Sequence, residues 1–262
     1  MMIDNYNHIN SNLFYVSDNI CGPTNDEESL KIFDDFSFQI NLQCNCFGKC
    51  GDMYCPCLKT ERYNDKNLLT THKNVIKSVP MFECNDRCSC TDECSNRVIQ
   101  KGPISGLIIK NCDKTEKGLC LFTNNFISKN TFICTYAGEI ITRKEAERRH
   151  RNNTLNNKMN YIFCLKEHCN GNVTETIVDP SVFGNIGRYI NHGCQPNSKI
   201  IPVRIDTPIP KLAIFSCVDI PAKTEITFDY GSNSLKLNSK DNLKKCFCLS
   251  SLCRQWMPYE LY

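Results

Sequence analysis

The amino-acid sequence predicts a mostly β domain, built of small sheets, that lies between two cysteine-rich zinc modules. From Leu107 onward, short apolar runs rich in β-branched and aromatic residues alternate with turn residues, a pattern typical of short strands. Nine of the 20 cysteines fall between residues 44 and 94, before those runs begin. Four more occur late in the chain, at Cys194, Cys246, Cys248 and Cys253.

Four segments follow one another along the chain. Residues 1–43 are rich in Asn and Asp, and we expect an extended lead-in that lies over the next module. The first cysteine-rich module covers residues 44–97, and the predicted β domain covers residues 98–232. Residues 233–262 form a cysteine-containing tail.

The first module carries nine cysteines in a pattern that suits metal binding: Cys44, Cys46, Cys50, Cys55, Cys57, Cys84, Cys88, Cys90 and Cys94. Three C-x-C pairs disfavour disulfides, because one intervening residue would force a strained ring. Zinc takes four thiolate or imidazole ligands in a tetrahedron. Nine thiolates fill the twelve ligand positions of three zinc ions when six are terminal and three bridge two ions each. The sequence therefore predicts a three-zinc cluster.

A disulfide-rich secreted domain is the alternative explanation of this cysteine density. The first eight residues are polar and lack the apolar segment of a secretory signal. No stretch approaches the roughly 20 apolar residues of a membrane span. We therefore expect a reduced, intracellular chain. Its net charge of +3 is too weak to indicate nucleic-acid binding by itself.

Within the β domain, four runs are predicted to be strands and one segment a helix. The strand runs are residues 107–109, 131–136, 161–165 and 213–215. The helix is expected after Thr142, because Thr142 and Glu145 form a capping-box pattern ahead of residues 146–151, four of which are Arg or His. Its basic face could contact DNA weakly, although a charged helix face is more often simply solvated.

Five sequence motifs occur in one order along the chain. They are the nine-cysteine block followed by residues 96–102, Tyr136-Ala137-Gly138-Glu139, Asn191-His192-x-Cys194-x-Pro196-Asn197, Phe228-Asp229-Tyr230-Gly231, and the tail Cys246-x-Cys248-x4-Cys253. In this order they resemble the pre-SET, SET and post-SET segments of lysine methyltransferases of the suppressor-of-variegation class. The resemblance covers nearly the whole chain.

The resemblance implies a SET fold of small curled β-sheets, in which the Asn-His segment is threaded under a C-terminal loop in a knot-like manner. It also implies transfer of methyl groups from S-adenosylmethionine to lysine 9 or lysine 36 of histone H3, in the nucleus and on chromosomes. The implied partner is the H3 tail or the nucleosome, with the peptide bound as an added strand. A catalytically weak or inactive chromatin-binding scaffold is the alternative. The sequence leaves the choice of lysine and the oligomeric state open.

The resemblance also assigns roles to individual residues. Tyr230 corresponds to the catalytic tyrosine, Tyr136 and Tyr161 line the same channel, and Phe228 occupies the position that limits the number of methyl groups. The cofactor residues implied are Gly118, Leu119, Cys120, Arg188, Asn191, His192 and Trp256. Trp256 could instead anchor the tail, since aromatic anchoring is common. Cys194 is expected to join Cys246, Cys248 and Cys253 around a fourth zinc ion.

An aromatic channel suits the chemistry of lysine methylation. A lysine amine with an ordinary pKa near 10.4 is a nucleophile only when neutral. Desolvation by aromatic walls and the positive sulfonium of the cofactor both favour the neutral amine. We expect dimethyl-lysine or trimethyl-lysine, because a Phe at position 228 cannot tether the amine as a Tyr would.

Cys120 departs from the family pattern. The family usually has Gly-x-Gly where the backbone approaches the cofactor, with an aromatic residue often between the glycines, and this chain has Gly118-Leu119-Cys120. A side chain at a glycine position can crowd a bound ligand. The sequence leaves open whether Cys120 weakens cofactor binding. The other cysteines outside the two zinc modules, Cys112 included, are expected to be small core residues.

Overall fold

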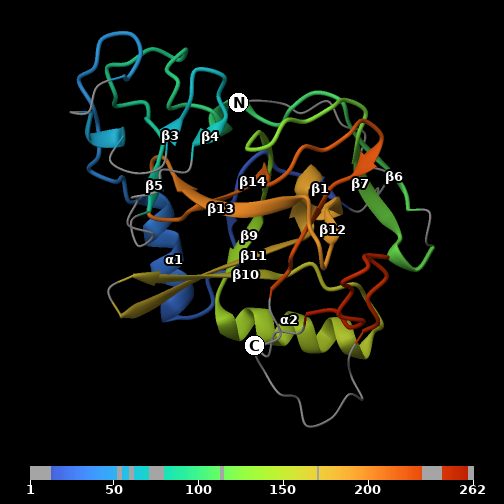
Figure 1. Ribbon diagram of the computed structural model, residues 1–262. Helices are drawn as coiled ribbons and strands as arrows, with labels where there is room; N and C mark the ends of the chain where they lie inside the picture. The colour runs from blue at the N-terminus through green and yellow to red at the C-terminus, as the bar shows by residue number, and fades with distance from the viewer. Residues whose placement is uncertain are drawn as a thin grey trace.

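The computed structural model describes residues 13–51, 55–58, 62–70, 80–112, 115–169, 171–231 and 244–258. In these ranges the strands form five small sheets, as predicted, rather than one large one. Figure 1 shows the cysteine-rich module at one end of the molecule and helix α2 along the opposite side, with the main sheets between them. No helix in the described ranges is long and apolar enough to cross a membrane.

The largest sheet has the strand order β1-β11-β9-β2, and β10 also pairs with β11. Its strands are β1 (Phe14–Tyr15), β2 (Ile20–Cys21), β9 (Gly138–Ile141), β10 (Phe163–Cys169) and β11 (Asn172–Gly184). β10 and β11 form an antiparallel hairpin in which Phe163 lies opposite Val178. The predicted strand at residues 161–165 thus begins two residues late, and residues 161 and 162 remain outside the sheet.

The expectation of an extended lead-in is wrong for residues 13–37. Strands β1 and β2 pair with β11 and β9, so this segment belongs to the main sheet and does not cover the cysteine-rich module. Helix α1 (Glu27–Ser37) follows, and a reciprocal capping box between Asp26 and Ser29 fixes its first turn. Ile32 and Phe36 pack against the main core. Residues 1–12 lie outside the described ranges.

A second sheet connects the cysteine-rich module to the β domain. Its order is β5-β13-β14-β8, formed by β5 (Met81–Phe82), β13 (Ser198–Arg204), β14 (Lys211–Ser216) and β8 (Phe132–Tyr136). The module strand β5 pairs parallel with β13, with Met81 opposite Val203. A small hairpin of β3 (Arg62–Tyr63) and β4 (Leu69–Thr70) lies beside it, and the 3-10 turn η1 (Pro56–Leu58) lies within the module.

Buried Glu83 strengthens the same junction. Its carboxylate accepts hydrogen bonds from Tyr63 Oη at 2.7 Å and from the backbone N–H groups of Val98 and Ile99 at 2.8 Å. Gln100 Nε2 donates a fourth bond at 2.8 Å. Burial raises the pKa of Glu83. Since these donors come from both sides of the junction, the carboxylate holds the module against the 3-10 turn η2 (Ile99–Lys101).

Two further small sheets position the motif residues. The first has the order β15-β7-β6, formed by β6 (Leu107–Asn111), β7 (Leu119–Thr123) and β15 (Thr224–Glu225), with the 3-10 turn η3 (Thr115–Lys117) between β6 and β7. The second pairs β12 (Asn191–His192) in parallel with β16 (Thr227–Phe228), just after the 3-10 turn η4 (Ile186–Tyr189). A Cβ atom on Gly193 would lie 2.8 Å from Thr227 Oγ1, so only glycine permits this close crossing. The Asn191–His192 segment thus lies directly beside Thr227–Phe228, and the expected knot-like threading under a C-terminal loop stays a prediction.

Helix α2 (Arg143–Leu155) confirms the predicted helix, although its basic residues are largely engaged in ion pairs. Thr142 Oγ1 accepts from the Glu145 N–H at 3.2 Å. The Glu145 carboxylate binds Arg148 and Arg149 instead of returning to the cap. A hydrogen bond from Arg148 lowers the pKa of Glu145 to about 2. Arg143 pairs with Glu175, which leaves a smaller free basic face than the sequence suggested.

Candidate active site and metal centres

A cavity of about 490 Å³ gathers most of the predicted active-site residues. It lies where η3, η4, the start of β10, the end of α2, β16 and the tail meet. The predicted residues that line it are Gly118, Leu119, Tyr136, Tyr161, Arg188, Asn191, Phe228 and Tyr230. Segments more than 100 residues apart in sequence therefore share one cavity.

Four aromatic rings form one part of this cavity. The Phe228 ring centroid lies 4.8 Å from that of Tyr230, 5.6 Å from that of Phe163 and 6.1 Å from that of Tyr136. The contacts are tilted or edge-on, the geometry that aromatic pairs favour. Phe163 was not predicted as a site residue, because a Phe in an apolar strand run has no feature that distinguishes it from core packing.

Two of the channel hydroxyl groups, those of Tyr136 and Tyr230, are fixed by backbone carbonyls. Tyr230 Oη donates to Ile190 O at 2.8 Å, and Tyr136 Oη donates to Tyr161 O. Burial raises the pKa of Tyr230 well above its usual range, so this phenol stays protonated at neutral pH. Because each O–H already donates to a carbonyl, each phenol oxygen is left to accept a hydrogen bond from another group.

Arg188 places a buried positive charge in the cavity wall. Its side chain crosses the Tyr161 ring, with the guanidinium carbon 4.1 Å from the ring centroid. Only 5% of the residue is exposed, and its Nε has no hydrogen-bond partner among the described residues. A buried charge without an anion is costly. The site therefore suits a ligand that brings a carboxylate, which guanidinium groups bind well.

Asn191 also lines the cavity, from the strand that pairs with the Phe228 strand. Its Nδ2 donates to Leu119 O at 3.0 Å and to Glu225 Oε1 at 3.4 Å. Glu225 in turn pairs with Lys117, which also lines the cavity. The sequence reasoning missed Lys117 and Glu225. The position of Lys117 directly before Gly118 was a usable signal, since chain neighbours of a predicted site residue often share its cavity.

His192 lies behind the cavity wall and supports it. Its Nδ1 accepts from the Tyr230 backbone N–H at 3.3 Å, and its Nε2 lies 3.3 Å from Cys194 Sγ. Burial lowers the pKa of His192 to about 4, so the imidazole is neutral. His192 thus links the channel tyrosine to the tail cysteines.

Three predicted cofactor residues do not line the cavity in the part of the chain that the structure describes: Cys120, His192 and Trp256. Trp256 pairs with Lys245 in an isolated bridge, as expected for a tail anchor. The tail residues that line the cavity are Lys244, Met257 and Pro258. Cys120 forms a disulfide with Cys112. Cys112 is therefore not the independent core thiol that the sequence suggested.

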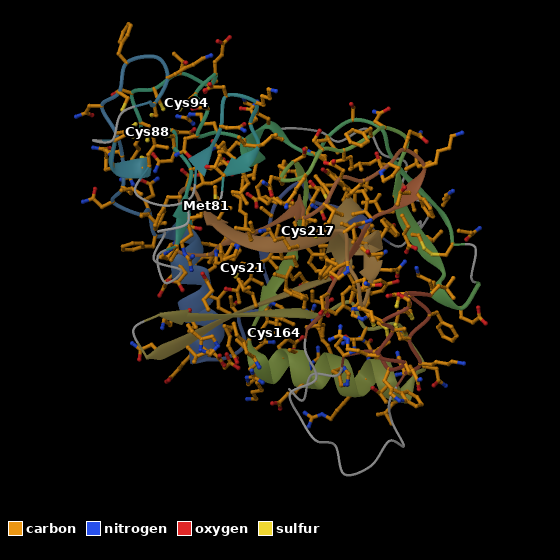
Figure 2. The ribbon with its side chains drawn as sticks, in the orientation of Figure 1. Cys21, Met81, Cys88, Cys94, Cys164 and Cys217 are labelled. Carbon is orange, nitrogen blue, oxygen red and sulfur yellow. A yellow bond between two sulfur atoms is a disulfide. The ribbon has the colours of Figure 1, made fainter. Side chains whose placement is uncertain are left out.

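The sulfur atoms of the first module are arranged for shared metal ions. Three groups have all their sulfurs within 4.8 Å of one another: Cys44, Cys46, Cys50 and Cys55; Cys44, Cys57, Cys84 and Cys88; Cys44, Cys50, Cys84 and Cys90. Cys44 belongs to all three groups, and Cys50 and Cys84 each belong to two. Cys94 lies beside Cys50, whose N–H donates to its sulfur at 3.4 Å. Figure 2 shows Cys88 and Cys94 in this module, apart from Cys21, Cys164 and Cys217 in the body of the protein.

The late cysteines form a second group. Cys194, Cys246, Cys248 and Cys253 have their sulfurs within 4.8 Å of one another, as the sequence predicted. Arg254 strengthens the closure, because its guanidinium pairs with Asp229 at 2.6 Å and its backbone N–H donates to Cys194 Sγ at 3.3 Å. The tail is thereby held next to Tyr230.

Known proteins resemble this chain along nearly its whole length. A SET domain model matches residues 118–231 and a Pre-SET motif model matches residues 2–97. Histone-lysine N-methyltransferase SETMAR of Bos taurus is 38% identical over 259 residues, which cover 94% of this chain and 81% of that protein. The crystal structure of the methyltransferase domain of human SETMAR has a TM-score of 0.79 at 35% identity, covering 95% of this chain and 90% of that one. Arabidopsis thaliana SUVH6 in complex with SAM has a TM-score of 0.73 at 25% identity, covering 98% of this chain and 52% of that one.

Proposed function

This chain belongs to the SET-domain family of histone-lysine N-methyltransferases, and we propose that it transfers methyl groups from S-adenosylmethionine to a lysine of histone H3. The observation that carries the proposal is that one cavity contains two parts of different chemical character. One half is an aromatic channel with two fixed phenols, and the other contains the buried charge of Arg188.

The aromatic half suits the lysine side chain. Apolar rings remove water from an entering amine and so favour its neutral, nucleophilic form. The oxygens of Tyr136 and Tyr230 can accept hydrogen bonds from the amine, since their own protons are directed to carbonyls. Holding the nitrogen in line with the transferred methyl group supplies much of the rate enhancement.

The other half suits S-adenosylmethionine, which supplies an electrophilic methyl group on a sulfonium when bound. Arg188 would bind the carboxylate of its amino-acid portion, and this contact would satisfy the partnerless Nε. Asn191 and the backbone of Gly118 and Leu119 would hold the same end of the molecule. SUVH6, described in complex with SAM, supports this choice of cofactor.

The H3 tail is the proposed substrate, with lysine 9 and lysine 36 as the candidate positions. Among the described strands, β10 pairs only with β11, so its other edge is available for an added peptide strand. This edge begins at Phe163, next to the channel. Such a protein would act in the nucleus, on chromosomes. Phe228 leaves space beside the amine, so the proposed products are dimethyl-lysine and trimethyl-lysine.

Four zinc ions complete the proposal, with three in the first module and one in the tail. Cys44, Cys50 and Cys84 would be the bridging thiolates, because they are the cysteines shared between sulfur groups. The remaining six cysteines of the module would be terminal ligands. The tail zinc would hold Cys194 and so fix the Asn191–His192 segment.

The test is methyl transfer with site mapping. Purified protein is incubated with S-adenosylmethionine carrying a labelled methyl group and with core histones, and labelled lysines are located by mass spectrometry. We expect label on H3, at lysine 9 or lysine 36. Cofactor binding without any transfer to histones would instead favour the alternative of an inactive chromatin-binding scaffold.

A further inference from the structure

Cys112 and Cys120 form a cysteine pair next to the proposed cofactor subsite. Cys120 lies opposite Lys110 in the β6–β7 hairpin. Cys112 follows directly after β6, where its N–H donates to Gly118 O at 2.9 Å, and is therefore a diagonal neighbour of Cys120. Their Cα atoms are 5.4 Å apart, within the range that a disulfide requires. Every other described cysteine whose state is assigned is a free thiol. The pair is thus distinct from both zinc modules.

The pair contacts the residue that connects the cavity to the hairpin. Asn191 Nδ2 lies 3.1 Å from Cys120 Sγ and 3.6 Å from Cys112 Sγ. The same nitrogen donates to Leu119 O, and both Asn191 and Leu119 line the cavity. A change at either sulfur is therefore transmitted directly to the cavity wall.

Breaking the disulfide must move a sulfur atom in a closely packed place. Bonded sulfurs are about 2.05 Å apart, whereas the sulfurs of two thiols stand at van der Waals contact, well beyond that length. Cys120 is fully buried and Cys112 is 7% exposed, so little free space is available. Protein interiors transmit such displacements. The Asn191 amide is in contact with both sulfurs and would be displaced by such a movement.

We propose that Cys112 and Cys120 are a reversible redox modification site that controls cofactor affinity, with the disulfide form binding more tightly. The proposal rests on the proposed function. The disulfide draws the Cys120 sulfur across the hairpin toward Cys112, away from the position where a side chain would crowd the ligand. Reduction releases that sulfur and disturbs Asn191.

A peroxide is the oxidant that fits this site. The Cys112 thiol, the more exposed of the two, loses its proton and attacks one peroxide oxygen. The O–O bond breaks to give a sulfenic acid, and the departing hydroxide takes up the released proton to form water. The Cys120 thiol then attacks the sulfenic sulfur, and the S–O bond breaks to release a second water. Two thiols and one hydrogen peroxide thus give one disulfide and two waters. A dithiol reductant reverses the change by exchange.

The disulfide itself is tested by digestion with trypsin without reductant. Cleavage after Lys110, Lys114 and Lys117 separates Cys112 and Cys120 onto two peptides, residues 111–114 and 118–129. Mass spectrometry should find these peptides joined after peroxide treatment and separate after treatment with a phosphine reductant. Failure to find the joined peptides after oxidation would overturn the proposal.

The effect on binding is tested by calorimetry with S-adenosylhomocysteine as the probe. Reduction of the wild-type protein should weaken binding about fivefold, the effect of losing one hydrogen bond, and reoxidation should restore it. Cys112→Ala should abolish this redox response. Cys21→Ala is the matched control, because Cys21 is a half-buried free thiol on β2, and it should keep the response. Zinc content is measured in each sample to confirm that the metal centres are intact.

Two results contradict the proposal in different ways. Equal affinity in both redox states, or a response that persists in Cys112→Ala, would overturn the redox proposal alone. Absence of S-adenosylhomocysteine binding in both states would overturn the proposed function and, with it, the redox proposal.

Discussion

The side chains of the proposed lysine channel divide the chemical work between them. Tyr136 and Tyr230 provide oxygens whose protons are already directed to carbonyls, while Phe163 and Phe228 provide apolar walls without a polar group. This division predicts separate effects for the removal or addition of one hydroxyl group.

Phe228→Tyr should shift the product toward monomethyl-lysine. A hydroxyl at this position can hold a water or bond the amine, which restricts the rotation that a second transfer requires. The first transfer should proceed at nearly the wild-type rate, because only the later geometry changes. Mass spectrometry of a methylated H3 peptide under excess cofactor measures the product distribution. A wild-type protein that stops at monomethyl-lysine would refute the assignment of Phe228.

Arg188→Met should weaken cofactor binding without lowering stability. Loss of a hydrogen bond to a charged group costs about 1.5–3 kcal/mol, or roughly 10-fold to 100-fold in affinity. The lost contacts with Tyr161 and Tyr189 should be offset, since the substitution also removes a buried charge that has a partnerless Nε. Calorimetry and thermal unfolding measure the two effects, with exposed Arg151→Met as the control. Unchanged affinity would place the carboxylate of the ligand elsewhere.

For individual residues, the sequence predicted the cavity residues that belong to motifs. It missed the residues that reach the cavity only through the fold. Tyr136, Arg188, Asn191, Phe228 and Tyr230 all reach the cavity. Phe163 and Lys117 also line the cavity, and Glu225 supports it through an ion pair with Lys117. These strand and ion pairings are not encoded in the motifs. The partnership of Cys112 with Cys120 depends on the register of one hairpin, and spacing alone did not reveal it.

Among the secondary-structure elements, α2 is tied to the main sheet by the Arg149 side chain. Its guanidinium binds Glu139 on β9 at 2.7 Å and Asp179 on β11 at 2.8 Å, in addition to Glu145 on its own helix. The Asp179 side chain is only 1% exposed. Among the described residues, Arg149 is the one cation that pairs with Glu139 and Asp179.

Arg149→Met should destabilise the protein by about 3–5 kcal/mol, because removing one partner leaves buried charges without compensation. Arg148→Met is the matched control on the same helix, and it should cost at most about 1 kcal/mol, since the Arg148 side chain is 65% exposed. Thermal or urea unfolding gives both values. An equal loss of unfolding free energy in the two variants would show that the buried ion-pair cluster does not hold α2 against the main sheet.

The sequence predicted elements well where local pattern and burial agree. The runs at residues 107–109, 131–136 and 213–215 became strands β6, β8 and β14. Helix α1 was missed, although Asp26 and Ser29 gave a local signal, because the Asn-rich and Asp-rich composition around it favoured an irregular segment. Strands β1 and β2 are two residues long, and they exist only through pairing with β11 and β9.

For the molecule as a whole, metal binding and folding should be coupled. The cysteine-rich module contributes a buried cluster made almost entirely of cysteines, and it joins the β domain through β5 and Glu83. The other buried apolar side chains described in this module, among them Tyr63, Leu69 and Met81, pack against the β domain. Loss of zinc should therefore propagate to the active site.

Elemental analysis should find close to four zinc ions per chain, from the nine and four cysteines of the two modules. Strong chelation should unfold the module and abolish methyl transfer, because structural zinc binding supplies folding free energy. Circular dichroism and activity are followed together during chelation. A protein with one zinc ion or none, and full activity, would contradict this coupling.

The central claim, that the aromatic channel performs methyl transfer, is tested most directly by the methylation rate of Tyr230→Phe at saturating S-adenosylmethionine. The account predicts a rate at least about 10²-fold below wild type, the usual effect of losing one positioned transition-state contact. Cofactor affinity measured in parallel should stay near the wild-type value, because the Tyr230 hydroxyl donates to Ile190 O and not to the groups around Arg188. A wild-type rate in the variant would contradict the account and assign catalysis to another part of the molecule.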